Sequence, residues 1–88
     1  MASHAEGTVT IANHANQHVF GEYNVADASS ENSYSRGNYI EIVGNGTASN
    51  TLSNARALDW SGNEYLKGDV YVGCSADSSS GTKLATIA

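Results

Sequence analysis

The chain has 88 residues and a formal net charge of −5, with only four Lys and Arg residues, which disfavours binding to a nucleic-acid backbone or to an anionic membrane surface. Leu, Ile, Val and Phe together supply 15 residues, too few for one chain of this size to bury a large core. Because the charge is moderate and the apolar residues are patterned, the composition favours an obligate oligomer over a disordered tail.

The single cysteine, Cys74, excludes an intramolecular disulfide and leaves no cysteine pair with zinc-binding spacing. No basic segment followed by an apolar run indicates a signal peptide, and no apolar run is long enough to predict a transmembrane helix. We therefore expect neither a leader nor membrane insertion.

The N-terminal segment, residues 3–12 (SHAEGTVTIA), alternates with a period of two and contains β-branched residues, which predicts a strand. His4 and Glu6 lie on one face of this strand. The small residues occupy the other face and are followed there by two aliphatic residues: Ser3, Ala5, Gly7, Val9 and Ile11. Residues 13–18 read as a turn, and residues 18–25 (HVFGEYNV) predict a second strand interrupted at Gly21.

The middle of the chain divides it into three parts. Residues 26–38 are polar and Ser-rich, which favours a linker between an N-terminal part, 1–25, and a C-terminal part, 39–88. Residues 39–43 (YIEIV) predict a strand with Ile40 and Ile42 on one face. Asn45-Gly46 favours a tight turn, and residues 47–54 read as a loop.

Residues 55–73 (ARALDWSGNEYLKGDVYVG) give the clearest pattern, because two apolar runs flank the short Gly-containing loop Ser61-Gly62-Asn63. This arrangement predicts a β-hairpin, with Leu58 and Trp60 on one face of its first strand. The tail is a polar loop followed by a short apolar end, and no long helix can be placed anywhere. The sequence therefore predicts an all-β fold.

Three histidines and their neighbours are the first candidates for chemistry. His4 and Glu6 share a strand face and can contact each other, but no nucleophile or pocket accompanies them, so a solvated polar face is the favoured interpretation. His14 and His18 have a helical i, i+4 spacing without helical surroundings. In a homotrimer, His4, His14 or His18 would meet its own copies at the axis, which leaves an axial ion site open.

Carboxylates and aromatic residues of the hairpin are the second candidates. Asp59, Glu64 and Asp69 flank its turns, where charged residues commonly protect strand edges, so paired-carboxylate catalysis is the weaker interpretation. Trp60, Tyr65 and Tyr71 would form a carbohydrate platform if exposed and an oligomer core if buried, and burial is favoured. We expect no enzymatic activity, no cofactor and no metal ligand set.

The segments SHAEG and TVTIANHANQHVFGEYNV resemble the head repeats of trimeric autotransporter adhesins and related bacteriophage tail-fibre segments. The piece GNYIEIVGNGTASNTLSNARALDWSGNEYLKGDVYVG is similar to a module of phage tail-fibre and minor structural proteins. Only one copy of SHAEG is present, so a repeated head is not predicted from the sequence.

This resemblance implies an intertwined homotrimer, β-roll-like at its N-terminal end and a hairpin or triple-β stem after it. The small residues Ser3, Ala5 and Gly7 would allow close packing. The trimer core would be drawn from Ile40, Ile42, Leu58, Trp60, Leu66, Val70 and Val72. The implied function is a tail-fibre segment, in the virion or in the bacterial cytoplasm before assembly, that joins other fibre segments and positions a tip for a host cell-surface receptor. A small adhesin that binds glycans through Tyr34, Tyr39, Trp60 or Tyr65 is the alternative.

Overall fold

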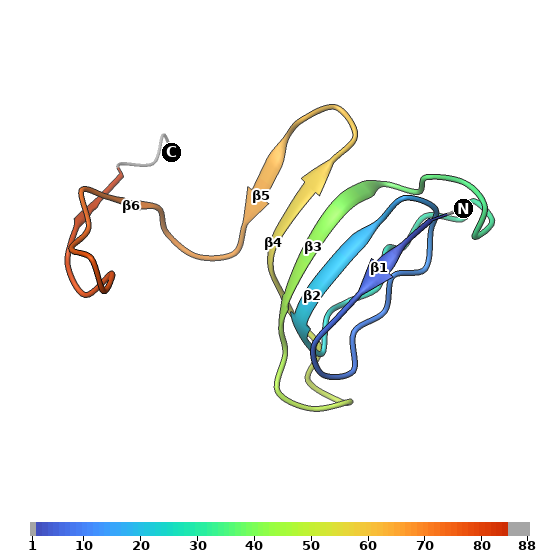
Figure 1. The fold of residues 1–88 in the computed structure, drawn as a ribbon, viewed down its shortest axis with the longest axis horizontal. Coiled ribbons are helices and arrows are strands. Elements are labelled where there is room, and N and C mark those ends of the chain that lie inside the picture. Colours follow the sequence, from blue (N-terminus) through green and yellow to red (C-terminus); the bar gives the residue numbers. More distant parts are fainter. Residues whose placement is uncertain (1, 85–88) are drawn as a thin grey trace.

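The structure is a computed structural model that describes residues 2–84, and the protein is all-β over this range, with no helix in it (Figure 1). Its seven strands are β1 (His4–Ala5), β2 (His18–Glu22), β3 (Tyr39–Asn45), β4 (Asn54–Asp59), β5 (Glu64–Leu66), β6 (Tyr71–Val72) and β7 (Thr82–Lys83). The predicted all-β class is thus confirmed. Within residues 2–84, no helix has the length and hydropathy that a membrane crossing requires.

A five-stranded sheet of order β1-β2-β3-β4-β5 makes up the main body. β1, β2 and β3 are parallel, whereas β3, β4 and β5 are antiparallel. Parallel neighbours require the chain to cross back between them, so residues between these strands form the return side of a small β-roll. The same sheet takes strands from residues 1–25 and from residues 39–88, and residues 26–38 connect them.

The first two turns of the roll repeat after 14 residues, as the pairing of His4 with His18 shows. Gly7 and Gly21 both have positive φ angles, +103° and +94°. Two residues further on, Val9 and Tyr23 also share positive φ angles, 49° and 45°. The predicted strand over residues 3–12 is therefore shorter than expected, because the backbone turns at Gly7. A second copy of the SHAEG conformation exists, although its sequence is different.

Three stacked glycines, Gly7, Gly21 and Gly44, form what we call the glycine column. A Cβ on Gly7 would overlap the carbonyl oxygen of Gly21, and a Cβ on Gly21 would overlap that of Gly44. Each turn of the roll thus approaches the next through bare backbone. We call each pass of the chain through the parallel part of the sheet a rung, and the glycine column is where neighbouring rungs meet backbone to backbone.

The apolar interior is small and follows one row across the sheet. Val19, Ile42 and Ala57 are buried and lie opposite one another in the strand register, and Ala15, between β1 and β2 in the chain, is buried as well. Burial of four apolar residues offers little hydrophobic stabilisation for a chain of this size. Hydrogen bonds of buried polar groups must therefore carry much of the specificity of this fold.

Asparagine side chains close the return side of the roll. Asn24 accepts a hydrogen bond from the backbone N–H of Ile11 at 2.8 Å and donates one to the carbonyl of the same residue at 3.2 Å. Asn54 does the same to Val25, at 2.7 and 3.1 Å. Each carboxamide bonds to the backbone as a peptide group of a neighbouring strand would. The N–H and C=O groups of the return side therefore find hydrogen-bond partners without a second sheet.

Residues 26–38 contain no strand, but they are attached to the roll through the buried Asp27, which is 5% exposed. Its carboxylate accepts hydrogen bonds from the backbone N–H groups of Ser29, Asn38 and Tyr39 and from Nε2 of Gln17, at 2.8 to 3.0 Å. This network, the Asp27 hub, holds the entry to β3 against the first turn of the roll.

The hairpin predicted around residues 61–63 is present as β4 and β5, with Asp59 and Asn63 joined by a 2.9 Å backbone hydrogen bond. Beyond it, residues 61–84 are all exposed, and β6 pairs with β7 instead of continuing the hairpin. These two strands contact no other described strand and project from the main sheet (Figure 1). The radius of gyration of 14.5 Å exceeds the roughly 12 Å of a compact domain of this length.

Candidate functional site

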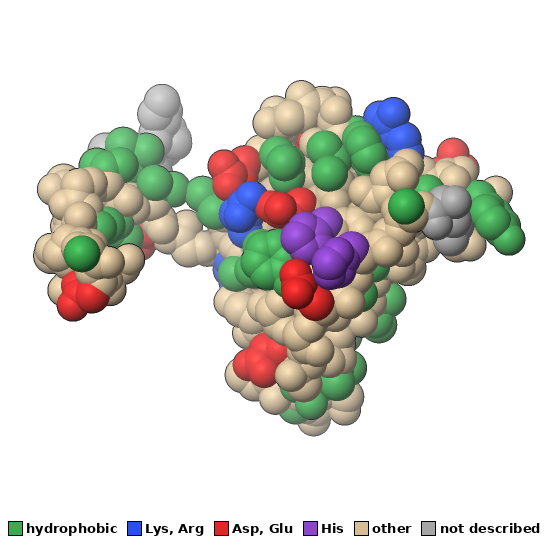
Figure 2. All heavy atoms as spheres, in the orientation of Figure 1, with side chains coloured by type: hydrophobic (Ala, Val, Ile, Leu, Met, Phe, Trp, Pro, Cys, Tyr) green, Lys and Arg blue, Asp and Glu red, His purple; other side chains and the backbone are tan. Residues whose placement is uncertain are grey.

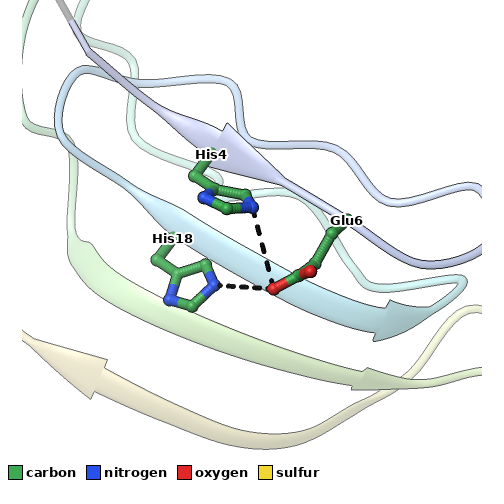
Figure 3. A group of neighbouring side chains, drawn as sticks. All are labelled: His4, Glu6 and His18. Carbon is green, nitrogen blue, oxygen red and sulfur yellow. Dashed lines mark hydrogen bonds and ion pairs between the residues drawn. The ribbon is translucent and has the colours of Figure 1, made fainter.

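Two histidines and a glutamate meet on the outer face of the sheet where β1 lies beside β2 (Figure 3). Oε1 of Glu6 is 3.3 Å from Nε2 of His18 and 3.7 Å from Nε2 of His4. One ligand atom from each of the three residues lies within 4.8 Å of the other two. We call this group the His4–Glu6–His18 cluster.

The strand geometry places these three side chains together. His4 and Glu6 are two residues apart and so project from the same face of the strand. His18 lies directly opposite His4 in the parallel register, and the backbone N–H groups of His4 and Glu6 bond to the carbonyls of Gln17 and Val19. The predicted contact between His4 and Glu6 is therefore found, and the 14-residue repeat adds His18 to it.

A second layer of charged side chains continues across the sheet. Glu41 is the register partner of His18, and its Oε2 lies 4.0 Å from Nδ1 of that histidine. Arg56 forms an ion pair with Glu41 and a second one with Glu64 at 2.8 Å. Figure 2 shows a purple histidine patch on this face with acidic side chains beside it. The cluster thus lies at one end of an alternating row of charges.

The third histidine has a different environment. His14 is only 3% exposed, and its Nδ1 lies 3.1 Å from the carbonyl oxygen of Asn32. It belongs to the return side of the roll and not to the His4–Glu6–His18 cluster.

The residues expected to form a trimer core differ widely in exposure within one chain. Ile42 is fully buried, Ile40, Leu58 and Trp60 are half-buried, and the others are exposed: Leu66 45%, Val70 37% and Val72 50%. Among the small residues, Ser3 and Ala5 are exposed at the free edge of the sheet, whereas Gly7 belongs to the glycine column.

An aromatic cavity of about 350 Å³ is the second feature of note, lined by Gly37, Asn38, Tyr39, Asp59, Trp60, Ser61 and Tyr65. Nε1 of Trp60 donates a 3.1 Å hydrogen bond to the carbonyl of Arg36, whose guanidinium carbon lies 3.9 Å above the indole ring. Tyr39 and Tyr65 meet edge to face, with centroids 6.1 Å apart. The cavity therefore combines three aromatic rings with a carboxylate.

The carboxylate of this cavity, Asp59, accepts a 2.7 Å hydrogen bond from the Tyr65 hydroxyl. That bond, supported by the backbone N–H of Asn63, lowers the pKa of Asp59 below its ordinary value and raises the pKa of Tyr65. Because the folded-state pKa of Asp59 is depressed, its contribution to stability is present above the unfolded value of 3.8 and is lost as the pH falls through the folded value.

Tyr65→Phe is therefore expected to raise the pKa of Asp59 towards 3.8, because the hydroxyl that stabilises the carboxylate is removed. An NMR titration of the Asp59 carboxyl carbon measures this shift. Tyr71→Phe is the matched control, since Tyr71 is equally exposed and is not among the groups that shift this pKa. An Asp59 pKa that is the same in Tyr65→Phe as in the unchanged protein would contradict the assignment.

The sequence pattern missed His18 as a partner of His4 and Glu6. The available signal was weak: each histidine precedes a glycine by three residues, as HAEG and HVFG, with the two copies 14 residues apart.

Comparisons with known proteins found no family model, no curated protein and no solved structure that matches the chain.

Proposed function

We propose that the chain is a structural segment of a bacteriophage or prophage tail fibre, which assembles as a homotrimer and supports a receptor-binding tip without catalysing a reaction. The observation that carries this proposal is the excess of exposed apolar surface over buried core. Within residues 2–84, four apolar residues are buried, whereas eleven large hydrophobic side chains are exposed. A chain with this ratio gains stability by burying the same surfaces against its own copies.

The C-terminal part supports the proposal most directly. Its exposed apolar side chains are Tyr65, Leu66, Val70, Tyr71, Val72 and Leu84. β6 and β7 pair only with each other, so no other strand within residues 2–84 covers the apolar side chains of these two strands. Three copies around one axis would cover these strands and close their free edges, giving a rod with high kinetic stability.

Sedimentation equilibrium tests the proposal, with an expected mass of three times the 9.2 kDa of one chain. The experiment needs several protein concentrations, because the stability of an obligate trimer depends on protomer concentration. A 9.2 kDa monomer that melts cooperatively would contradict it.

Val72→Asp is expected to weaken the trimer by at least about 2 kcal/mol per chain, because each copy would bring a charge into a buried apolar contact. The fraction of trimer at equal protein concentration measures the effect. Ser80→Asp introduces the same charge into the exposed loop before β7 and is expected to leave the trimer intact. Equal trimer fractions for both variants would place Val72 outside the interface.

The aromatic cavity favours a second candidate function, a small carbohydrate-binding module. Aromatic rings stack on the apolar faces of sugars, and the carboxamide of Asn38 offers hydrogen-bonding groups for hydroxyls at the same place. Quenching of Trp60 fluorescence by host-surface glycans, lost on Tyr39→Ala, would support this function. A fluorescence signal that such glycans leave unchanged would exclude it.

A further inference from the structure

We propose that the His4–Glu6–His18 cluster binds one divalent transition-metal ion per chain, with Zn²⁺ as the representative ion. The proposal concerns a ligand site within one chain and is independent of the proposed tail-fibre function. It also differs from an ion held on a three-fold axis, because every ligand comes from the same copy.

The ligand set fits this class of ion. Two imidazole nitrogens and one carboxylate oxygen are the protein ligands of many zinc sites and of other first-row transition-metal sites, whereas Ca²⁺ and Mg²⁺ prefer oxygen ligands alone. Three protein ligands leave a fourth position for water.

The distances fit as well. Zinc bonds of about 2.1 Å at tetrahedral angles place ligand atoms about 3.4 Å apart. Oε1 of Glu6 lies 3.3 Å from Nε2 of His18 and 3.7 Å from Nε2 of His4. The two imidazole rings are tilted by 46° with centroids 4.8 Å apart, so both Nε2 atoms approach the same carboxylate oxygen (Figure 3). Because the three ligand atoms all lie within 4.8 Å of one another, small side-chain rotations would bring them to this spacing.

Neighbouring side chains orient His18 for binding through Nε2. Its other nitrogen, Nδ1, lies 4.0 Å from Oε2 of Glu41, so when an ion takes the Nε2 position the ring proton would sit on Nδ1 and face this carboxylate. Arg56 holds Glu41 in place through an ion pair. The ring of Phe20, 5.0 Å from that of His18, restricts the imidazole from the other side. This arrangement resembles the outer shell that supports histidine ligands in metal sites.

The ion would connect the outermost strand to its neighbour. β1 has only two residues and one pairing partner, and His4 and Glu6 lie at or beside it, whereas His18 begins β2. An ion that binds the folded state alone stabilises it in proportion to the logarithm of its free concentration. The predicted effect is therefore a clamp on the N-terminal edge of the sheet.

Calorimetric titration of the protein, prepared without a polyhistidine tag, with Zn²⁺ tests the proposal. We expect one ion per chain, an increase in melting temperature with Zn²⁺, and neither effect with Mg²⁺. His18→Ala and Glu6→Gln are each expected to weaken Zn²⁺ binding at least about tenfold, because each removes one of three ligands. Glu22→Gln removes an exposed carboxylate from the same strand as His18 and outside the cluster, and it is expected to bind Zn²⁺ like the unchanged protein.

Imidazole NMR resonances give a second measurement that needs no variant. Zn²⁺ is expected to shift the signals of His4 and His18 and to leave those of the buried His14 unchanged. Three outcomes would overturn the proposal: no binding of Zn²⁺, one ion per three chains, or binding that survives in His18→Ala and Glu6→Gln with its affinity unchanged.

Discussion

Gly21→Ala is expected to destabilise the fold by at least about 3 kcal/mol, because one methyl group adds backbone strain and a steric overlap together. Gly21 has a φ of +94°, which alone costs an L-residue about 1 to 2 kcal/mol. The added Cβ would also overlap the carbonyl oxygen of Gly44, which is backbone and cannot rotate away. The second and third strands of the roll, β2 and β3, would have to separate at the glycine column.

Substitutions of two other glycines distinguish the cost of the positive φ from the cost of the steric overlap. Gly62 has a similar φ of +91°, and no atom lies within 4 Å of an added Cβ. Gly62→Ala is therefore expected to cost only the free energy of the strained backbone, about 1 kcal/mol. Gly68→Ala meets neither constraint and is expected to change stability by less than about 0.5 kcal/mol. Urea denaturation at one protein concentration measures all three. A Gly21→Ala cost equal to that of Gly62→Ala would show that the close approach of the rungs contributes nothing.

Asp27→Asn is expected to cost about 2 to 3 kcal/mol, although it changes the side-chain volume very little. Both carboxylate oxygens of the Asp27 hub accept hydrogen bonds, from Ser29 on one side and from Gln17, Asn38 and Tyr39 on the other. An asparagine has one oxygen and one NH₂ group. In either orientation, its NH₂ group would face one of these two sets of donors. At least one buried N–H group would then lose its acceptor.

Asp69→Asn is the matched control for Asp27→Asn. Asp69 is half-exposed and faces Lys83 across 3.8 Å, an ion pair of the kind that contributes less than about 1 kcal/mol. Thermal unfolding of both variants measures the difference. In addition, Asp27→Asn is expected to accelerate amide exchange at Ser29 if the NH₂ group replaces Oδ1, or at Asn38 and Tyr39 if it replaces Oδ2. Unchanged protection of all three amides in Asp27→Asn would contradict the role of the hub.

Local patterns in the sequence predicted the antiparallel part of the fold. The apolar runs on either side of Ser61-Gly62-Asn63 identified β4 and β5, because a hairpin is encoded by residues that are close in the chain. The alternation of residues 39–43 likewise identified the centre of β3 and its buried Ile42.

The parallel part could not be read in the same way. The rungs at His4 and at His18 share a conformation through a few positions only, chiefly a histidine and a glycine, so the repeat is hard to recognise in the letters. β2 and β3 pair with an offset of 23 residues, as His18 and Glu41 show, so no constant period links all three rungs. Parallel pairing depends on residues that are distant in the chain, such as Asn24 and Asp27, and these polar residue types are also typical of loops.

The candidate site, too, could be predicted from the sequence only where residues close in the chain define it. His4 and Glu6 could be placed on one face from their spacing alone, because a strand alternates its side chains. The contribution of His18, and of Glu41 behind it, depends on the parallel register, which the sequence did not reveal. Residues 26–38 read as a linker because serines dominate them, and only the buried carboxylate of Asp27 shows how they are attached.

Because the strand direction changes at β3, further parallel strands can be added to this roll at one end only. On one side, β3 meets the antiparallel β4, so a further parallel rung cannot be inserted there without breaking the hairpin. On the other side, β1 has an edge that no other strand of residues 2–84 pairs with. A duplicated stretch of 14 residues ahead of β1 would continue the glycine column and lengthen the roll by about 4.8 Å, the spacing of neighbouring strands. Evolution can therefore adjust the length of such a protein in fixed increments, while its cross-section stays the same.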